Sequence, residues 1–172
     1  GDPDEIIVPE IYLQGAGEAF VLTIVVSWLM TWTYNPKIID RNLLKDLFGY
    51  NNVCVGFDTP PARYFAVPMF ALVSFLAMRY VRLDSLRAQL QIIEEDESLK
   101  ITRCQYWTTR VCNACYGFFM CCLSLLLVVS PDVDRGFHTM GYLAIIVFDW
   151  LVFFANYLEA KEVTNASKVW IT

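Results

Sequence analysis

The stretch AFVLTIVVSWLMTWTY, residues 19–34, decides the fold, because it is a continuous apolar run without a charged residue. Residues 13–17 before it extend the run to the roughly 20 residues that a helix needs to cross the hydrocarbon core of a bilayer. We therefore predict a membrane-spanning helix over residues 13–34, and the fold of the whole chain follows from finding more segments of this kind.

The composition of the full chain agrees with a membrane protein. Of the 172 residues, 56% are hydrophobic and only 18% are charged, which is far from the composition of a soluble domain. The net charge is −5 and no basic block occurs, so nucleic acid is not expected as a partner. The chain has a single histidine, so few of its residues are suited to acid–base or metal catalysis, and we expect no enzyme activity.

A second helix is predicted over residues 61–96. The double proline Pro60-Pro61 is suited to open it, and its apolar part covers residues 64–78. Beyond Arg82, four apolar side chains continue at helical spacing among charged residues, so the helix is expected to project from the membrane as an amphipathic stalk. These four residues are Leu83, Leu86, Leu90 and Ile93. We expect the stripe to dock on another subunit or on the return segment 98–107, because four such side chains are not expected to face water.

Two further helices complete an all-α, four-helix integral membrane protein with one domain, residues 1–172. They are predicted over 108–130 and 137–158, and the short link between them requires an antiparallel hairpin. Residues 36–48 alternate apolar and charged positions at helical spacing and predict a short amphipathic helix in the membrane interface. Lipids are therefore expected partners along most of the chain.

Basic residues flanking the short loops predict the orientation. More Lys and Arg residues lie on the side that holds both termini than on the other side, which favours termini inside. The membrane itself stays open between an organelle inner membrane, mitochondrial or thylakoid, and an endomembrane.

Asp149 and Asn113 are the polar residues expected within the membrane. Asp149 falls near the centre of the fourth helix, where an ionised side chain costs at least about 2.5–3.5 kcal/mol on insertion scales. One interpretation is a proton relay or a ligand anchor. The other is a protonated or hydrogen-bonded group that faces Asn113 or Ser124 on the third helix, or a neighbouring subunit.

Cysteines on the third helix raise the question of a metal site. Cys104 and Cys122 lie about 27 Å apart on one helix, so they cannot share an ion, and no metal site is expected. Cys104, Cys115 and Cys122 instead fall on one side of the helix and predict a close helix–helix contact.

His138 is the one candidate for cofactor binding. Its imidazole could serve as one axial ligand of haem or of a chlorophyll magnesium, although alone it cannot make a bis-histidine haem site. The alternative is a residue at the membrane interface, at the start of the fourth helix. No other cofactor is expected.

Four short motifs occur in the order found in one known family. They are PPARY at residues 60–64, MRYVRL at 78–83, LLLVVS ending at residue 130, and HTMGY at 138–142. The chain resembles the first four helices of the damage-regulated autophagy modulator/Frag/Sfk superfamily of multi-pass membrane proteins, which typically have six. The resemblance implies an endomembrane, lysosomal or plasma-membrane protein with cytosolic termini and without established catalytic residues.

Three hypotheses for function follow. The first is a non-catalytic accessory or scaffold subunit of a larger membrane protein complex, such as an organellar respiratory or photosynthetic assembly. The second is a regulatory endomembrane protein of the autophagy modulator/Frag kind. The third is a small transporter or proton-conducting component centred on Asp149.

Overall fold

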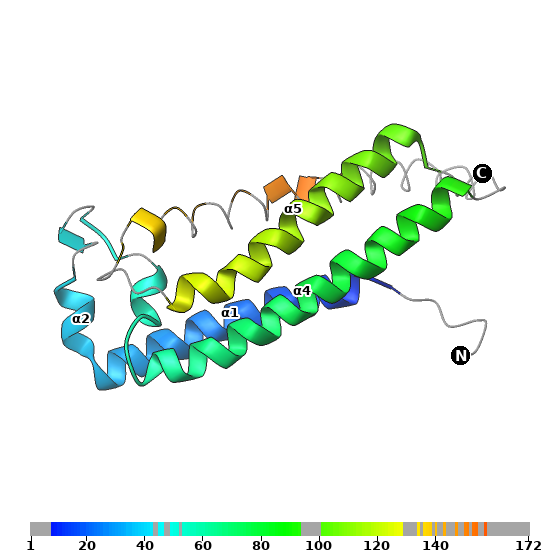
Figure 1. The fold of residues 1–172 in the computed structure, drawn as a ribbon. Coiled ribbons are helices and arrows are strands. Elements are labelled where there is room, and N and C mark those ends of the chain that lie inside the picture. The colour runs from blue at the N-terminus through cyan, green and yellow to red at the C-terminus, as the bar shows by residue number, and fades with distance from the viewer. Residues whose placement is uncertain are drawn as a thin grey trace, which may run out of the picture.

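The computed structural model describes residues 8–42, 45–46, 49–51, 53–93 and 101–128, of which 121–128 are described by backbone alone. It also describes residues 134, 136–138, 140, 143, 147, 150–151, 153–154 and 157. Within this part of the chain every regular element is a helix. The elements are α1 (Glu10–Tyr34), α2 (Pro36–Asp40), the 3-10 turn η1 (Val53–Gly56), α4 (Ala62–Ile93) and α5 (Arg103–Val128) (Figure 1).

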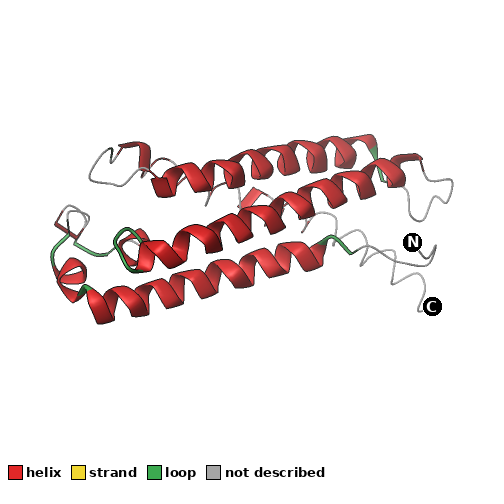
Figure 2. Cartoon of the chain, turned by 60° about the horizontal axis from the view of Figure 1, so that its bottom comes forward, coloured by secondary structure: helices red, strands yellow, loops and turns green. Residues whose placement is uncertain are grey.

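Three long helices, α1, α4 and α5, lie side by side (Figure 2). The central one is α4, which packs against both α1 and α5, while α2 and η1 gather at one end of the bundle (Figure 1). Two of the helices, α1 and α4, are long and apolar enough to cross a membrane. The all-helical class predicted from the sequence is therefore confirmed for the described residues.

Helix boundaries differ from the prediction mainly at the ends. Helix α1 begins at Glu10 rather than at residue 13, and α5 begins at Arg103 rather than at residue 108. Helix α4 is one continuous helix that includes the predicted stalk, with Pro68 inside it. The predicted interfacial helix 36–48 is interrupted, because α2 ends at Asp40, where Arg41 takes an extended backbone conformation, and residues 45–46 are helical again.

Small side chains make up the buried face of α1 and half of the buried face of α4. The buried residues of α1 are Ala16, Thr23, Ser27 and Thr31. Those of α4 are Ala62, Ala66, Phe70, Val73, Ala77, Tyr80, Asp84 and Ala88. Small side chains let two helix backbones approach closely, and a threonine hydroxyl inside such a contact can bond back to its own helix. Thr23 Oγ1 does this, donating to the carbonyl oxygen of Ala19 at 2.6 Å.

Helix α5 packs on the opposite side of α4 through larger groups. Tyr116 and Met120 are buried, and the Tyr116 ring meets that of Tyr80 edge to face with 6.4 Å between centroids. Ser74 Oγ donates to the carbonyl oxygen of Met120 at 2.8 Å. A Cβ added to Gly117 would lie 3.2 Å from the Met78 sulfur. The two helices are therefore in close contact at this glycine.

The cysteine stripe predicted on the third helix does not form this contact. Cys104 is exposed and Cys115 is only half-buried, because the side of α5 that faces α4 carries Thr109, Asn113 and Tyr116 instead. The side chain of Cys122 lies outside the described residues. A role of the stripe toward another chain stays a prediction.

The predicted fourth helix is described only at separate positions between residues 136 and 157, each of which has helical conformation. Asp149 lies outside the described residues.

Candidate functional site

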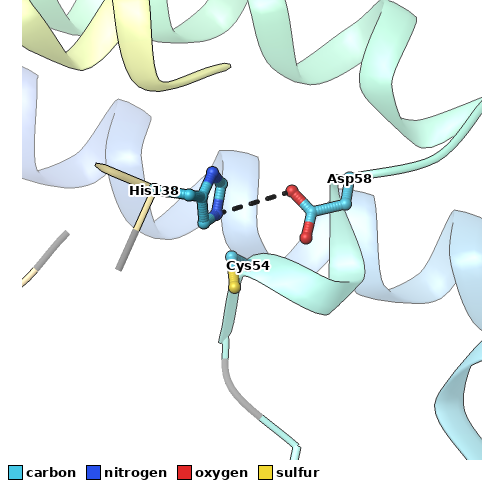
Figure 3. Close-up of side chains that lie close together, drawn as sticks. All are labelled: Cys54, Asp58 and His138. Carbon is cyan, nitrogen blue, oxygen red and sulfur yellow. Dashed lines mark ion pairs between the residues drawn. The ribbon is translucent and has the colours of Figure 1, made fainter. Parts of the chain in front are cut away.

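Three side chains with metal-binding or catalytic chemistry converge at the end of the bundle that carries α2. Cys54 belongs to η1, Asp58 follows it in the loop before α4, and His138 comes from the helical turn 136–138 (Figure 3). Their sulfur, carboxylate and imidazole atoms all lie within 4.8 Å of one another. The distance from His138 Nε2 to Asp58 Oδ1 is 3.8 Å. We call these three residues the loop cluster.

The part of the loop that carries Cys54 and Asp58 is held against α1 by side-chain donors. Trp28 Nε1 donates to the carbonyl oxygen of Val53 at 3.0 Å, and Thr31 Oγ1 donates to that of Gly56 at 2.6 Å. Asn35 Nδ2 donates to the carbonyl oxygen of Pro60 just beyond Asp58. Three residues spaced about one helical turn apart thus bind three successive points of the loop.

Gly56 is required by the approach of this loop to α1. A Cβ at this position would lie 2.7 Å from Trp28 Cγ, a distance at which backbone or ring has to move. On the other side, the Phe57 ring packs against Phe70 of α4 with centroids 5.2 Å apart. The loop therefore packs between the Trp28 indole and the surface of α4, and contacts with both helices determine its conformation.

His138 is positioned by an N-terminal cap of its own turn. Asp134 Oδ1 accepts a hydrogen bond from the backbone N–H of Phe137 at 2.9 Å, and the Asp134 carbonyl accepts one from the N–H of His138 at 3.1 Å. An aspartate at this position is a favoured start for a helical turn. The imidazole is buried, with 4% of the residue exposed, and faces the loop (Figure 3).

Burial determines the chemistry of Cys54. The residue is 1% exposed, and burial, followed by the nearby negative charge of Asp58, raises the pKa of its thiol from 9.0 to about 12. A thiol that is protonated and inaccessible is a poor nucleophile, since the thiolate is the reactive form. Cysteine, histidine and aspartate are also the ligand types of a zinc site, in which the cation itself deprotonates the thiol.

A second cluster of polar side chains lies at the opposite end of the bundle and connects all three long helices. Asp84 of α4 is buried, accepts a hydrogen bond from Asn113 Nδ2 of α5 at 2.6 Å, and pairs with Arg87 one turn further along α4. Arg87 in turn pairs with Glu10 at the start of α1. We call these four residues the polar network. Arg79 adds to the same region by lying over the Tyr12 ring of α1, with 5.6 Å from its Cζ to the ring centroid.

The residues proposed from sequence are placed as follows. Asn113 is buried as a polar group, but its partner among the described residues is Asp84, which the sequence analysis did not single out. His138 is buried against Asp58, and both its role as an axial ligand and its position at the membrane interface stay predictions. In the stalk, Leu83 is half-buried, whereas Leu86, Leu90 and Ile93 are exposed.

Asp84 carried a signal that the sequence analysis missed. It continues the buried face of α4, four residues after Tyr80 and four before Ala88, so its position predicts burial by helical periodicity alone. Cys54 and Asp58 carried no such signal, because they lie in a loop and meet His138 only through the tertiary fold.

Comparison of the chain with protein families, with curated proteins and with solved structures finds no match.

Proposed function

We propose that the protein is a non-catalytic, multi-pass accessory or scaffold subunit of a larger membrane protein complex. The observation that carries the proposal is the exposed apolar stripe at the end of α4. Leu86 is 47% exposed, Leu90 64% and Ile93 74%, in a segment that also carries Arg82, Asp84 and Arg87.

The membrane part of the proposal rests on how side chains are distributed by size. The buried residues of α1 are all alanine, serine or threonine, and four of those of α4 are alanine, whereas many large apolar side chains of both helices point outward. The outward set includes Val21, Leu22, Val25, Leu29, Leu72 and Phe75. Small residues between helices and large apolar residues outside are favourable when the surroundings are lipid chains. We propose that α5 and the segment 137–158 cross the membrane as well.

The stalk supports a partner subunit. Beyond Arg79 and Arg82 the helix leaves its apolar part, so lipid chains are not expected to cover its last turns. In the described part of the return segment, the N–H of Ile101 donates to the carbonyl oxygen of Gln91 at 3.4 Å, near the end of α4. Leu86 and Leu90 are not covered by the described part of the chain. Burying a leucine contributes about 1.5–3 kcal/mol, which gives a docked helix a substantial driving force.

A non-catalytic role is supported by the burial of the reactive groups. Cys54 and His138 are almost completely covered, and Asp84 is tied to Asn113 and Arg87. A catalytic set requires side chains that a substrate can reach. An organellar respiratory or photosynthetic complex is the assembly that we propose first.

Single substitutions at neighbouring exposed positions test the docking. Leu90→Glu places a charge within the stripe, and Gln89→Glu places the same charge beside it. We expect Leu90→Glu to release the protein from its complex during native gel electrophoresis of gently solubilised membranes, while Gln89→Glu stays bound. Both variants should still insert in the membrane, as extraction with alkaline carbonate shows. Equal co-migration of the two variants with the complex would contradict the proposal.

A regulatory endomembrane protein of the autophagy modulator/Frag kind is the second candidate. One contact favours it: Asp58, two residues before the PPARY motif, faces His138, the first residue of the HTMGY motif. The loop that leads into one motif thus meets the first residue of another. The full-length transcript separates the candidates, because two additional helices after residue 172 favour this family and an upstream transit peptide favours the organellar subunit.

A further inference from the structure

We propose that Cys54, Asp58 and His138 bind one divalent transition cation of the zinc class. This inference is independent of the accessory function, since it concerns the end of the bundle opposite the stalk.

The types of ligand select the cation. A thiolate and an imidazole suit borderline and soft cations such as Zn²⁺, whereas Mg²⁺ and Ca²⁺ prefer sites made of oxygen atoms. Cysteine, histidine and aspartate are all ordinary zinc ligands. Three protein ligands leave the fourth tetrahedral position of the ion to a water molecule.

The geometry is close to what an ion requires. In a tetrahedral site with Zn–N and Zn–O bonds of about 2.0–2.1 Å, the two ligand atoms lie roughly 3.3 Å apart. His138 Nε2 and Asp58 Oδ1 are separated by 3.8 Å, and the Cys54 sulfur is within 4.8 Å of both. The ion would therefore draw the imidazole and the carboxylate together by about half an ångström.

The supporting structure holds all three ligands in place. Trp28 and Thr31 bind the backbone of η1 on either side of Cys54, and the Asp134 cap orients the turn that carries His138. Ligands positioned by such surrounding contacts bind metals more tightly, since little conformational freedom is lost on binding.

Charge balance also favours a cation here. The bound thiolate and the Asp58 carboxylate together carry two negative charges, which a divalent ion neutralises. The thiol proton of Cys54 leaves to water as the sulfur–metal bond forms. Nucleophilic catalysis is the other chemistry available to Cys, His and Asp, but it requires an accessible thiol, and Cys54 is 1% exposed.

Cobalt and zinc titrations of the full chain in detergent micelles test the site. After removal of bound metal, we expect the wild type to bind one Co²⁺ per chain, with thiolate-to-cobalt charge-transfer absorption, and Zn²⁺ to displace it. Cys54→Ser should abolish this absorption, and Cys54→Ser, Asp58→Asn and His138→Gln should each weaken Zn²⁺ binding by at least about tenfold. Cys104→Ser, which removes an exposed cysteine, should change neither quantity.

Two further measurements keep the test decisive if a ligand variant does not fold. His138→Cys keeps a zinc ligand at this position and should retain Zn²⁺. A chain in which Cys54 is the only remaining cysteine should still show one sulfur neighbour at about 2.3 Å in zinc X-ray absorption spectra. The proposal is wrong if the folded wild type binds no stoichiometric metal, if Cys54→Ser binds as tightly as the wild type, or if this single-cysteine chain shows no sulfur neighbour.

Discussion

The two ends of the helical bundle are held together in different ways. At the stalk end, the polar network connects α1, α4 and α5 directly, through side chains that project from regular helices. At the other end, the loop cluster depends on η1 and the loop after it, whose backbone is held by Trp28 and Thr31 of α1 and by Asn35 directly after that helix. The comparison shows that helix register alone brings the first group together, whereas the second also requires the loop to take one conformation.

The two ends also differ in how exposed their charges are. Within the polar network, the Asp84 side chain is 1% exposed and that of Glu10 is 48% exposed, so the ionic contacts extend from the interior to the surface. The loop cluster is covered more evenly, with Cys54 and His138 both buried. Substitutions at the two ends should therefore show how much more a buried polar group contributes to stability than an exposed one.

The largest expected effect concerns the reactivity of the cysteine in the loop cluster. Because the pKa of Cys54 is raised to about 12, its thiolate population in metal-free protein should be about a thousandfold below that of a thiol with pKa 9.0. Alkylation of Cys54 should be far slower than that of the exposed Cys104, because its thiol is both buried and protonated, and it should accelerate as pH rises. Mass spectrometry of peptides after timed labelling measures both rates. Similar rates for the two cysteines would mean that the loop opens readily.

Removal of the buried acid should have the largest effect on stability at the stalk end. Asp84→Ala leaves Asn113 and Arg87 without their carboxylate and should lower the free energy of unfolding by about 3–5 kcal/mol. Glu10→Gln alters the exposed part of the same network and should cost less than about 1 kcal/mol. Denaturant unfolding in micelles, followed by circular dichroism, measures the difference. Equal effects of the two substitutions would show that burial does not decide the strength of this network.

A pair of glycines tests how rigid the loop end is. Gly56→Ala should lower the free energy of unfolding by about 1–3 kcal/mol, because the added methyl group meets the Trp28 ring. Gly17→Ala in α1 is the matched control: nothing lies within 4 Å of its added Cβ, and alanine favours the helix. The control should be neutral or stabilising by up to about 1 kcal/mol in the same unfolding assay. A destabilised control with an unaffected Gly56→Ala would refute the close packing of the loop on α1.

The smallest expected effect comes from a single hydroxyl. Thr31→Val removes the hydrogen bond to the carbonyl oxygen of Gly56 and should cost about 0.5–1.5 kcal/mol. Thr33→Val is the control, since the exposed Thr33 hydroxyl only bonds back to Leu29 of its own helix. Its effect should stay within about 0.5 kcal/mol. If the two substitutions cost the same in denaturant unfolding, the Thr31 hydroxyl does not hold the loop.

The sequence by itself determined the helical class and the long helices. An apolar run of bilayer length predicts α1, and the shorter run 64–78 after the double proline predicts α4. The spacing of Leu83, Leu86, Leu90 and Ile93 correctly predicts that α4 continues beyond its apolar part. Such features depend on residues that are neighbours along the chain, and helical periodicity relates them without knowledge of the fold. The same periodicity was sufficient to place Asp84 on the buried face of α4.

The tertiary structure alone decided which polar groups meet. Asn113 pairs with Asp84 because α5 packs on α4 in one register, and a shift by one turn would give Asn113 another neighbour. Cys54 and Asp58 come from η1 and the loop after it, whereas His138 comes from a helical turn far away in the sequence, and no periodicity relates the two segments. Their convergence depends on the Trp28 and Thr31 hydrogen bonds, which form only once the loop packs on α1, and on the position that packing gives to the turn 136–138.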